Sequence, residues 1–207
     1  AMGGDAGPQP VVDGAAAALE AGLGARILFF GDEAVLEPLR RAHASLAGAE
    51  IRHASGVVSM TDKPGQVLRR GRDTSMWAAM NALQSGEAQA VVSGGNTGAL
   101  MAIGMFRLGM IEGVDRPAIT ALWPSPRGRV VVLDVGANVE ASEDQLVQFA
   151  IMGEAFFRAL TGKKKPTVGL LNVGAEELKG HELIRTAARV LRTADPDMAF
   201  EGFVEGN

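Results

Sequence analysis

The chain has 207 residues, no cysteine, a formal net charge of −4 and a sequence pI of about 5.4. This composition excludes disulfides, cysteine-based catalysis and zinc-finger spacing, and the acidic balance argues against a nucleic-acid-binding protein. The histidines are scattered singly, so no metal site is expected. The apolar stretch at residues 99–110 is interrupted by Gly104, Arg107 and Gly109, well short of the ~20 residues that a membrane span needs.

Six short apolar runs predict buried strands, because they are continuous and rich in Val, Ile and Leu. In chain order they cover residues 26–30, 89–93, 118–123, 129–135, 167–173 and 199–204. Helical patterns lie between most of them, and the clear ones cover residues 75–85, 143–160 and 181–192. A capping box, Ser142 with Gln145, marks the start of the second of these. Proline and charge at residues 123–129 predict a loop tip between two strands, so part of the sheet is expected to be antiparallel.

The alternation of strands and helices predicts an α/β fold class, with an open, mostly parallel sheet and helices on both faces. No repeat, low-complexity segment or convincing linker interrupts the pattern, so residues 1–207 are expected to form a single α/β domain. Glycine is in excess, with 27 residues, about twice its usual share of ~7%.

Many of these glycines lie at three junctions that share one design. Each junction follows an apolar strand, carries glycine at the turn and leads into a helix: SGGNTG (93–98), DVGANVE (134–140) and NVGAEELKG (172–180). Such junctions line the edge of an open α/β sheet where ligands bind, and free N–H groups at helix N-termini favour anions there. Tight turns alone would explain the glycines of any one loop. Three such loops together predict a phosphate or carboxylate site, although no standard nucleotide-binding loop is present.

Seven motifs recur in a recognisable order and spacing: AMGGDAGP (1–8), VVSGGNTGALMA (91–102), GVDRPA (113–118), VVLDVGANVE (131–140), LVQFAIMG (146–153), GLLNVGAEELKG (169–180) and VEGN (204–207). The series resembles the phosphate:acyl-(acyl carrier protein) acyltransferase family, PlsX, nearly end to end. The resemblance implies transfer of a fatty acyl group from acyl carrier protein to inorganic phosphate, giving acyl phosphate for phospholipid synthesis. It also implies an isocitrate/isopropylmalate dehydrogenase-like fold, a homodimer and a cytoplasmic location, with peripheral association at the inner face of the membrane as a further option.

The chain departs from the family pattern in a few places. Gly94 stands where the family usually has alanine, and Ala6 stands where a bulkier residue is common. By the same resemblance, the chain is expected to lack the strand before the first motif and the C-terminal part of the family. The roles of individual residues are therefore carried over only where the motifs match.

Attack of phosphate on a thioester carbonyl needs a held dianion, donors for the developing oxyanion and stabilisation of the leaving thiolate. It needs no cofactor and no covalent enzyme intermediate, in agreement with the absent cysteine and the absent G-x-S-x-G elbow. The expected phosphate cradle consists of the backbone N–H groups of residues 94–98 and two side chains, and its members are Gly94, Gly95, Asn96, Thr97 and Gly98.

Five further residues are candidates for catalytic roles. Asn138 and Asn172 are expected to donate to the carbonyl oxygen, and Lys179 to neutralise phosphate charge. Asp5 and Asp134 are expected to orient donors or manage a proton. Each assignment has a structural alternative: Thr97 as a helix N-cap, Asp134 and Asn138 as turn-forming side chains, and Lys179 as a solvated lysine.

Two basic runs stand out on this acidic chain. Arg69, Arg70 and Arg72 form one, and Lys163 to Lys165 form the other. Acyl carrier protein is strongly acidic, so the arginines are expected to steer its approach, whereas the lysines are typical of a turn between a helix and a strand. A merely solvated face is the alternative for both runs.

Other function classes remain open at this point. A phosphotransacetylase using coenzyme A or a nicotinamide-dependent dehydrogenase would use similar junctions, but a dehydrogenase should show an acidic metal cluster and a nucleotide-reading loop, and neither is visible. A non-catalytic small-molecule-binding or scaffold protein of the same fold is the third class. The homodimer is favoured further by residues 99–111, which are too apolar for a helix with one exposed face.

Overall fold

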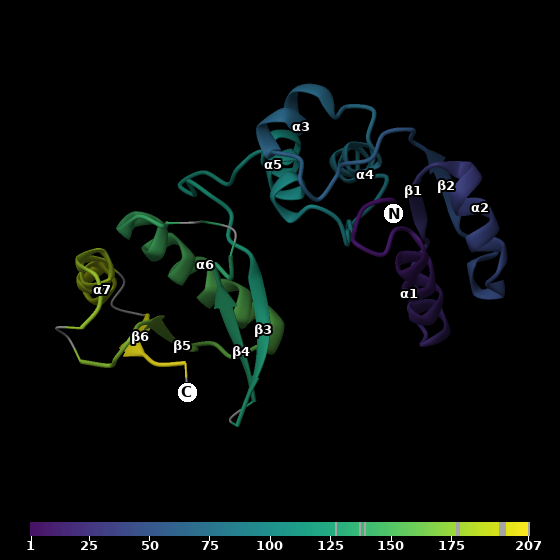
Figure 1. Cartoon of the computed structure of the whole chain (residues 1–207). Helices are drawn as coiled ribbons and strands as arrows, with labels where there is room; N and C mark the ends of the chain where they lie inside the picture. Colours follow the sequence, from purple (N-terminus) through teal and green to yellow (C-terminus); the bar gives the residue numbers. More distant parts are fainter. Residues whose placement is uncertain (127, 137, 139, 177–178, 195–197, 207) are drawn as a thin grey trace. The chain divides into compact units, whose positions relative to one another are not determined.

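The computed structural model describes residues 1–126, 128–136, 138, 140–176, 179–194 and 198–206. The chain divides into two compact units, Ala1–Gly109 and Met110–Asn207 (Figure 1). The prediction of a single domain stays a prediction. Several residues of the quoted motifs lie outside the described residues, as does one residue of the expected loop tip: Arg127, Ala137, Val139, Glu177, Leu178 and Asn207.

The first unit begins with a small α/β layer. Its elements are α1 (Gln9–Glu20), β1 (Leu28–Gly31), α2 (Glu33–Arg41), a short 3-10 turn η1 (Ala44–Leu46) and β2 (Glu50–His53). Strands β1 and β2 pair in parallel, with Leu28 opposite Glu50. Asp32 caps α2 by accepting a hydrogen bond from the Ala34 amide at 2.9 Å. The fully buried Val12, Leu36 and Leu46 join the helices to this layer.

Three helices complete the first unit: α3 (Pro64–Arg70), α4 (Ser75–Gln84) and α5 (Thr97–Leu108). They enclose a second apolar cluster, in which Trp77 of α4 and Ile103 of α5 are buried. The aromatic rings of Trp77 and Phe106 lie 5.8 Å apart. Since α5 packs on both α3 and α4, its first turn is held in a fixed position.

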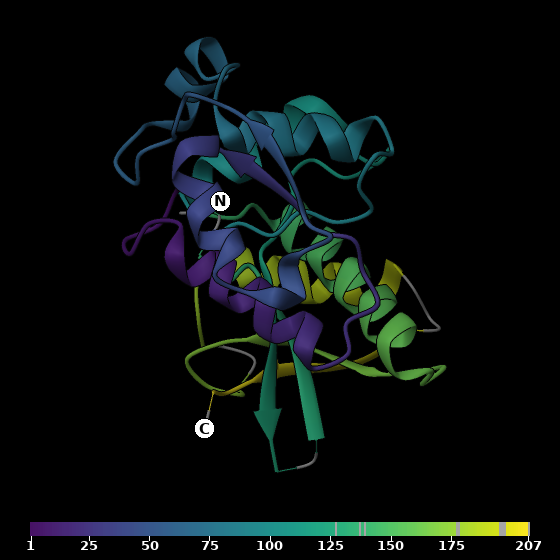
Figure 2. The ribbon, with the colours of Figure 1, turned by 90° about the vertical axis from the view of Figure 1, so that its right-hand side faces the viewer.

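The second unit contains an antiparallel hairpin and a parallel pair. Figure 2 shows β3 (Thr120–Ser125) beside β4 (Gly128–Leu133), which are antiparallel. The long helix α6 (Glu143–Thr161) follows, then β5 (Thr167–Leu171), α7 (Glu182–Ala194) and β6 (Ala199–Val204). Strands β5 and β6 are parallel, with a register shift between Val168 and Gly169. Side chains of α6, α7, β5 and β6 share one core that includes the buried Leu170, Leu191 and Phe203.

The predicted α/β class with mostly parallel pairing is confirmed, and so are most of its elements. The helices at residues 75–85, 143–160 and 181–192 appear as α4, α6 and α7, and the capping box of α6 is formed by Ser142 and Gln145. The hairpin is also confirmed. The described strands form three two-stranded sheets. Among the described helices, none combines the length and apolar character needed to cross a membrane.

Two strand predictions differ from the structure. Residues 89–93 form no strand, because no described strand offers their backbone a hydrogen-bonding partner, and Val92 is 91% exposed. Strand β2 was missed by the apolar-run criterion, because its sequence EIRH has polar side chains at three of its four positions and is only partly buried. A strand requires a neighbouring strand, and an apolar run alone does not reveal whether one is present.

Candidate functional site

The turn that precedes α5 is anchored by Asn96. This residue is the N-cap of α5, and its Oδ1 accepts a hydrogen bond from the Ala99 amide at 3.0 Å. Its Nδ2 donates to the carbonyl oxygens of residues 59, 60 and 62 at 3.0, 3.2 and 3.0 Å. Asn96 is 8% exposed, so these bonds occupy the whole side-chain amide. The N-cap alternative considered for Thr97 is therefore wrong by one residue.

Several backbone N–H groups of the same turn remain free. The Gly95 amide donates to Ser93 Oγ at 3.2 Å, whereas the amides of Gly94, Asn96, Thr97 and Gly98 donate to no described residue. They lie at the start of α5, where the helix dipole carries partial positive charge. This arrangement supports an anion site, with its contacts provided by the backbone rather than by the side chain of Asn96.

The glycines of this turn pack against the first motif of the chain. A Cβ atom on Gly4 would lie 2.8 Å from the Gly94 carbonyl oxygen, and one on Gly3 would lie 3.2 Å from the Gly95 Cα. Gly4 also has a positive φ of 104°. The two backbones are therefore in direct contact. A Cβ on Gly94 itself would meet nothing within 4 Å, so this position stays open to a ligand.

Asp5 and the three arginines belong to the same unit as this turn. Asp5 follows the Gly3–Gly4 contact directly and is exposed. Arg69 and Arg70 lie in the last turn of α3 and Arg72 just beyond it, and all three are exposed. Helix α3 begins beside the turn, because a Cβ on Gly98 would lie 3.3 Å from the Pro64 Cγ.

In the second unit, Asp134 holds Asn138. Asp134 Oδ1 accepts hydrogen bonds from the Asn138 Nδ2 at 2.8 Å and from its backbone amide at 3.3 Å. Among the described residues, Asp134 is the one non-glycine with a positive φ, at 64°, which indicates local backbone strain. The pair thus has the geometry of an acid that orients an amide. Asn138 Oδ1 is buried and has no partner among the described residues.

Asn172 and Lys179 lie in one loop after β5. Asn172 Nδ2 donates to the carbonyl oxygens of Gly174 and Lys179 at 3.1 and 3.0 Å, so neither of its side-chain N–H groups is free in this structure. Lys179 Nζ pairs with Glu176 Oε1 at 2.7 Å. The hydrogen bond between them raises the pKa of Lys179 and lowers the pKa of Glu176. The loop also contacts the last motif, because the Ala175 amide donates to Glu205 Oε1 at 3.1 Å.

The structure thus groups the predicted residues in two sets. In the first unit it joins residues 94–98 to the Gly3–Gly4 backbone, with Asp5 next in the chain. In the second it pairs Asp134 with Asn138 and closes the loop of Asn172 and Lys179. Sequence reasoning missed Glu176, although its spacing of three residues from Lys179 is a usual signal of an ion pair. Across the described part of the chain, no group of three or more metal-ligating side chains could hold a metal ion.

The whole chain, residues 1–207, matches the profile of the family described as "Fatty acid synthesis protein". The chain belongs to the fatty acid synthesis protein family. Two curated relatives, both named "Phosphate acyltransferase", come from Maricaulis maris (strain MCS10) and Caulobacter vibrioides (strain ATCC 19089 / CIP 103742 / CB 15). They are 55% and 53% identical to this family member over 210 and 208 residues, which cover 100% of this chain and 60% and 58% of the relatives. The chain therefore spans about 60% of the length of the curated relatives it matches.

A solved structure, "EutD phosphotransacetylase from Staphylococcus aureus", resembles this family member with a TM-score of 0.53 and 16% sequence identity. The match covers 88% of this chain and 59% of that chain. At this identity the likeness bears on the fold alone. It confirms the predicted α/β class of the isocitrate dehydrogenase-like type.

Proposed function

We propose that the protein is a phosphate acyltransferase that moves a fatty acyl group from acyl carrier protein thioester to inorganic phosphate, giving acyl phosphate for phospholipid synthesis. The observation that carries the proposal is 55% identity, over all of this chain, to a relative named "Phosphate acyltransferase". The free amides of residues 94 and 96–98 support it, because they provide donors for a phosphate ion at the start of a helix.

In the proposed reaction a phosphate oxygen attacks the thioester carbonyl carbon. The new C–O bond forms, the C–S bond breaks, and the carrier leaves as its thiolate, so no cofactor and no covalent enzyme intermediate is required. Asn138 has one side-chain N–H beyond the one donated to Asp134, and this N–H is proposed to stabilise the carbonyl oxygen. Asn172 would have to release one of its two carbonyl partners to do the same.

Lys179 and Asp5 have proposed roles of a different kind. Lys179 is proposed to neutralise phosphate charge, and its pairing with Glu176 keeps it protonated. Asp5 is exposed beside the glycine contact, where it is proposed to orient donors or to accept a proton.

The direct test is to incubate the full-length protein with acyl carrier protein thioester and phosphate, and to look for acyl phosphate by mass. A parallel reaction with acyl coenzyme A tests the phosphotransacetylase-like alternative. Acyl phosphate formed only from the coenzyme A thioester would show that coenzyme A, and not acyl carrier protein, is the acyl donor. No product from either donor, with folded protein, would favour the non-catalytic binding or scaffold alternative.

We propose that acyl carrier protein approaches over Arg69, Arg70 and Arg72. All three are exposed on the acidic chain, and α3 begins beside the turn of residues 94–98. Arg69→Glu with Arg70→Glu should raise the KM for the carrier thioester by about 5- to 10-fold at low salt and by less at high salt, since exposed charges are screened. The reaction with a small acyl thioester should change little.

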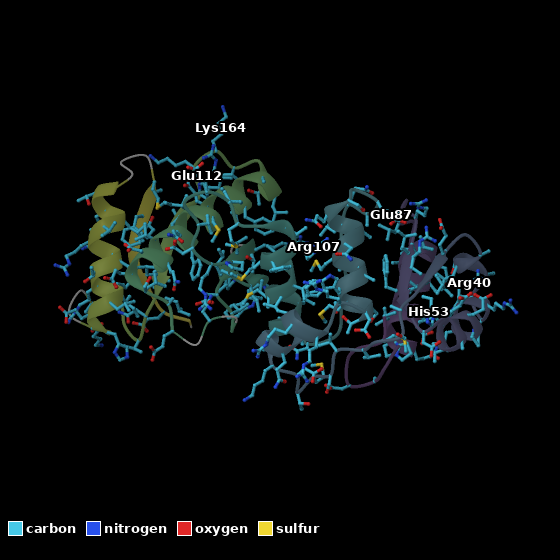
Figure 3. The ribbon with its side chains drawn as sticks, turned by 90° about the horizontal axis from the view of Figure 1, so that it is seen from above. Arg40, His53, Glu87, Arg107, Glu112 and Lys164 are labelled. Carbon is cyan, nitrogen blue, oxygen red and sulfur yellow. The ribbon has the colours of Figure 1, made fainter. Side chains whose placement is uncertain are left out.

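A matched control uses the second basic run. Lys163→Glu with Lys164→Glu makes the same change of charge at a turn of the second unit, where Lys164 extends away from the ribbon (Figure 3). This variant should keep the KM for the carrier. Equal losses in both double variants would mean that net charge, rather than the arginines, governs the encounter.

We also propose that the protein assembles as a homodimer in the cytoplasm. The support is apolar exposure at the end of α5, where Phe106 is 59% exposed and Leu108 is 50% exposed. Light scattering of the full-length protein at micromolar concentration should give twice the monomer mass. A monomer mass would overturn the dimer.

A further inference from the structure

Ser75 is a buried residue whose hydroxyl has no hydrogen-bond partner among the described residues. It is the first residue of α4 and is 5% exposed. Its backbone amide donates to the Gly56 carbonyl oxygen at 3.0 Å, but its side chain makes no hydrogen bond to a described residue. The adjacent Thr74 behaves differently, because its hydroxyl donates to the Gly71 carbonyl and caps α4. The Ser75 hydroxyl is therefore available to a partner from outside the described chain.

Ser75 lines a cavity beside the turn of residues 93–98. The cavity has a volume of about 30 Å³ and is also lined by Gly3, Ser93 and Gly94. Its other walls are mostly apolar, and they include Val58, Met76 and Leu100. A volume of this size holds one or two groups the size of a water molecule. It does not hold an acyl chain.

The polar groups around this cavity are suited to bind a ligand atom that accepts hydrogen bonds. The Gly94 amide is one of the free donors of the proposed phosphate cradle. Ser75 stands at the N-terminal end of the ten-residue helix α4, where the helix dipole is positive. No lining residue has a charged side chain, so nothing in the wall repels an anion. An oxygen atom of an oxyanion meets these conditions, whereas a cation does not.

We propose that Ser75 is a further binding residue of the 94–98 site, and that its hydroxyl donates a hydrogen bond to one oxygen of the bound phosphate. The assignment rests on the proposed function for the identity of the anion. It adds a contact from α4 to the contacts that the turn before α5 provides. The N-terminal ends of α4 and α5 would then both contribute to one site.

The first test is kinetic. Ser75→Ala in the full-length protein should raise the KM for phosphate by about 10- to 100-fold, the range expected for losing a hydrogen bond to a charged ligand. The KM for the acyl carrier thioester should stay the same, and so should the melting temperature, because the Ser75 backbone keeps its bond to Gly56. Ser75→Thr retains the hydroxyl and should recover most of the phosphate affinity.

A control variant lies on the same helix. Ser85, at the other end of α4, donates its hydroxyl to the Ala82 carbonyl oxygen at 3.2 Å. Ser85→Ala should leave the KM for phosphate unchanged. An unchanged KM in Ser75→Ala as well, or a fall in melting temperature without a change in KM, would overturn the assignment.

A binding measurement separates this inference from the proposed reaction. Phosphate alone should raise the melting temperature of the wild-type protein, and Ser75→Ala should abolish most of that rise. If the wild type makes no acyl phosphate but shows the rise, and Ser75→Ala loses it, the reaction is wrong and Ser75 remains a phosphate ligand. If phosphate does not raise the wild-type melting temperature at any concentration tested, the Ser75 assignment is wrong too.

Discussion

Gly4→Ala is expected to destabilise the protein by about 2 to 5 kcal/mol, since it adds strain of roughly 1–2 kcal/mol for the backbone and 1–3 kcal/mol for overpacking. The backbone strain arises because Gly4 has a φ of 104°. The overpacking arises because the new Cβ would lie 2.8 Å from the Gly94 carbonyl oxygen. The contacted Gly94 oxygen is a backbone atom, so no flexible side chain can move aside to relieve the contact.

The same substitution should reduce activity by more than its effect on stability implies. Relief of the contact requires a shift of the turn that carries the free Gly94 amide. A displacement of about 1 Å at a positioning group can cost ~100-fold in rate. We therefore expect kcat/KM for phosphate to fall about 100-fold at a temperature where Gly4→Ala is fully folded. Urea unfolding and phosphate kinetics measure the two effects separately.

Gly7→Ala is the matched control in the same loop. Gly7 also has a positive φ, at 67°, but a Cβ there would meet nothing within 4 Å. It should cost only the backbone strain of roughly 1–2 kcal/mol and leave phosphate kinetics close to wild type. If Gly4→Ala and Gly7→Ala behave alike, the contact between the two loops does not position the turn.

The sequence predicted the turn at residues 93–98, but not the Gly3–Gly4 backbone that packs against it. Glycines and an apolar run are local signals, and they indicated a turn at residues 93–98 that leads into a helix, which the structure has as α5, although the strand expected at residues 89–93 does not form. The contact between Gly4 and Gly94 joins segments 90 residues apart in the chain, and no local period reports it. The glycines suggested close approach of a ligand. In the structure, one side of Gly95 is approached by the Gly3 backbone instead, and Gly94 keeps its open side.

For the polar residues of the site, too, the sequence predicted the local turns but not the hydrogen-bond partners of each side chain. Their types and spacing indicated turns with side-chain hydrogen bonds, and Asp134 with Asn138 has that geometry. What could not be read from the sequence is which atoms remain free. Asn172 was expected to be a donor, yet two carbonyl oxygens of its own loop take both N–H groups. Such pairing depends on the closed path of the loop, which residue types alone do not specify.

Asn96 replacements should also have a large effect on stability. Asn96→Ala removes the cap of α5 and three contacts to carbonyl oxygens at 3.0 to 3.2 Å. The cap contributes about 1 kcal/mol, and each of the two side-chain N–H groups contributes a similar amount through its hydrogen bonding, so the expected loss is about 3 kcal/mol. For a protein of this size that corresponds to a melting temperature lower by about 6–12 °C. A loss of less than about 1 kcal/mol would contradict the anchoring role.

Asn96→Asp should be worse than Asn96→Ala at neutral pH. It keeps the oxygen that accepts from the Ala99 amide but places a carboxylate oxygen against the same three carbonyl oxygens. A buried charge without a donor is strongly unfavourable, so the folded state raises the pKa of this new carboxyl above its unfolded value of about 3.9. Its stability is then highest below the unfolded pKa and falls as the pH rises through the folded one. Urea unfolding should show a larger deficit against wild type at pH 7 than at pH 4.5, whereas the deficit of Asn96→Ala should change little between them.

Phosphate kinetics of the folded Asn96→Ala protein test whether Asn96 only anchors the turn or also binds phosphate directly. If Asn96 only anchors the turn, the backbone amides remain in place well below the melting temperature, and the KM for phosphate should rise less than about threefold. Direct binding predicts a rise of about 10- to 100-fold, the cost of a lost hydrogen bond to a charged ligand. The structure favours the first result, because the side-chain amide is already bonded on both its nitrogen and its oxygen. A large rise in KM in a fully folded variant would show that phosphate displaces one of those carbonyl partners.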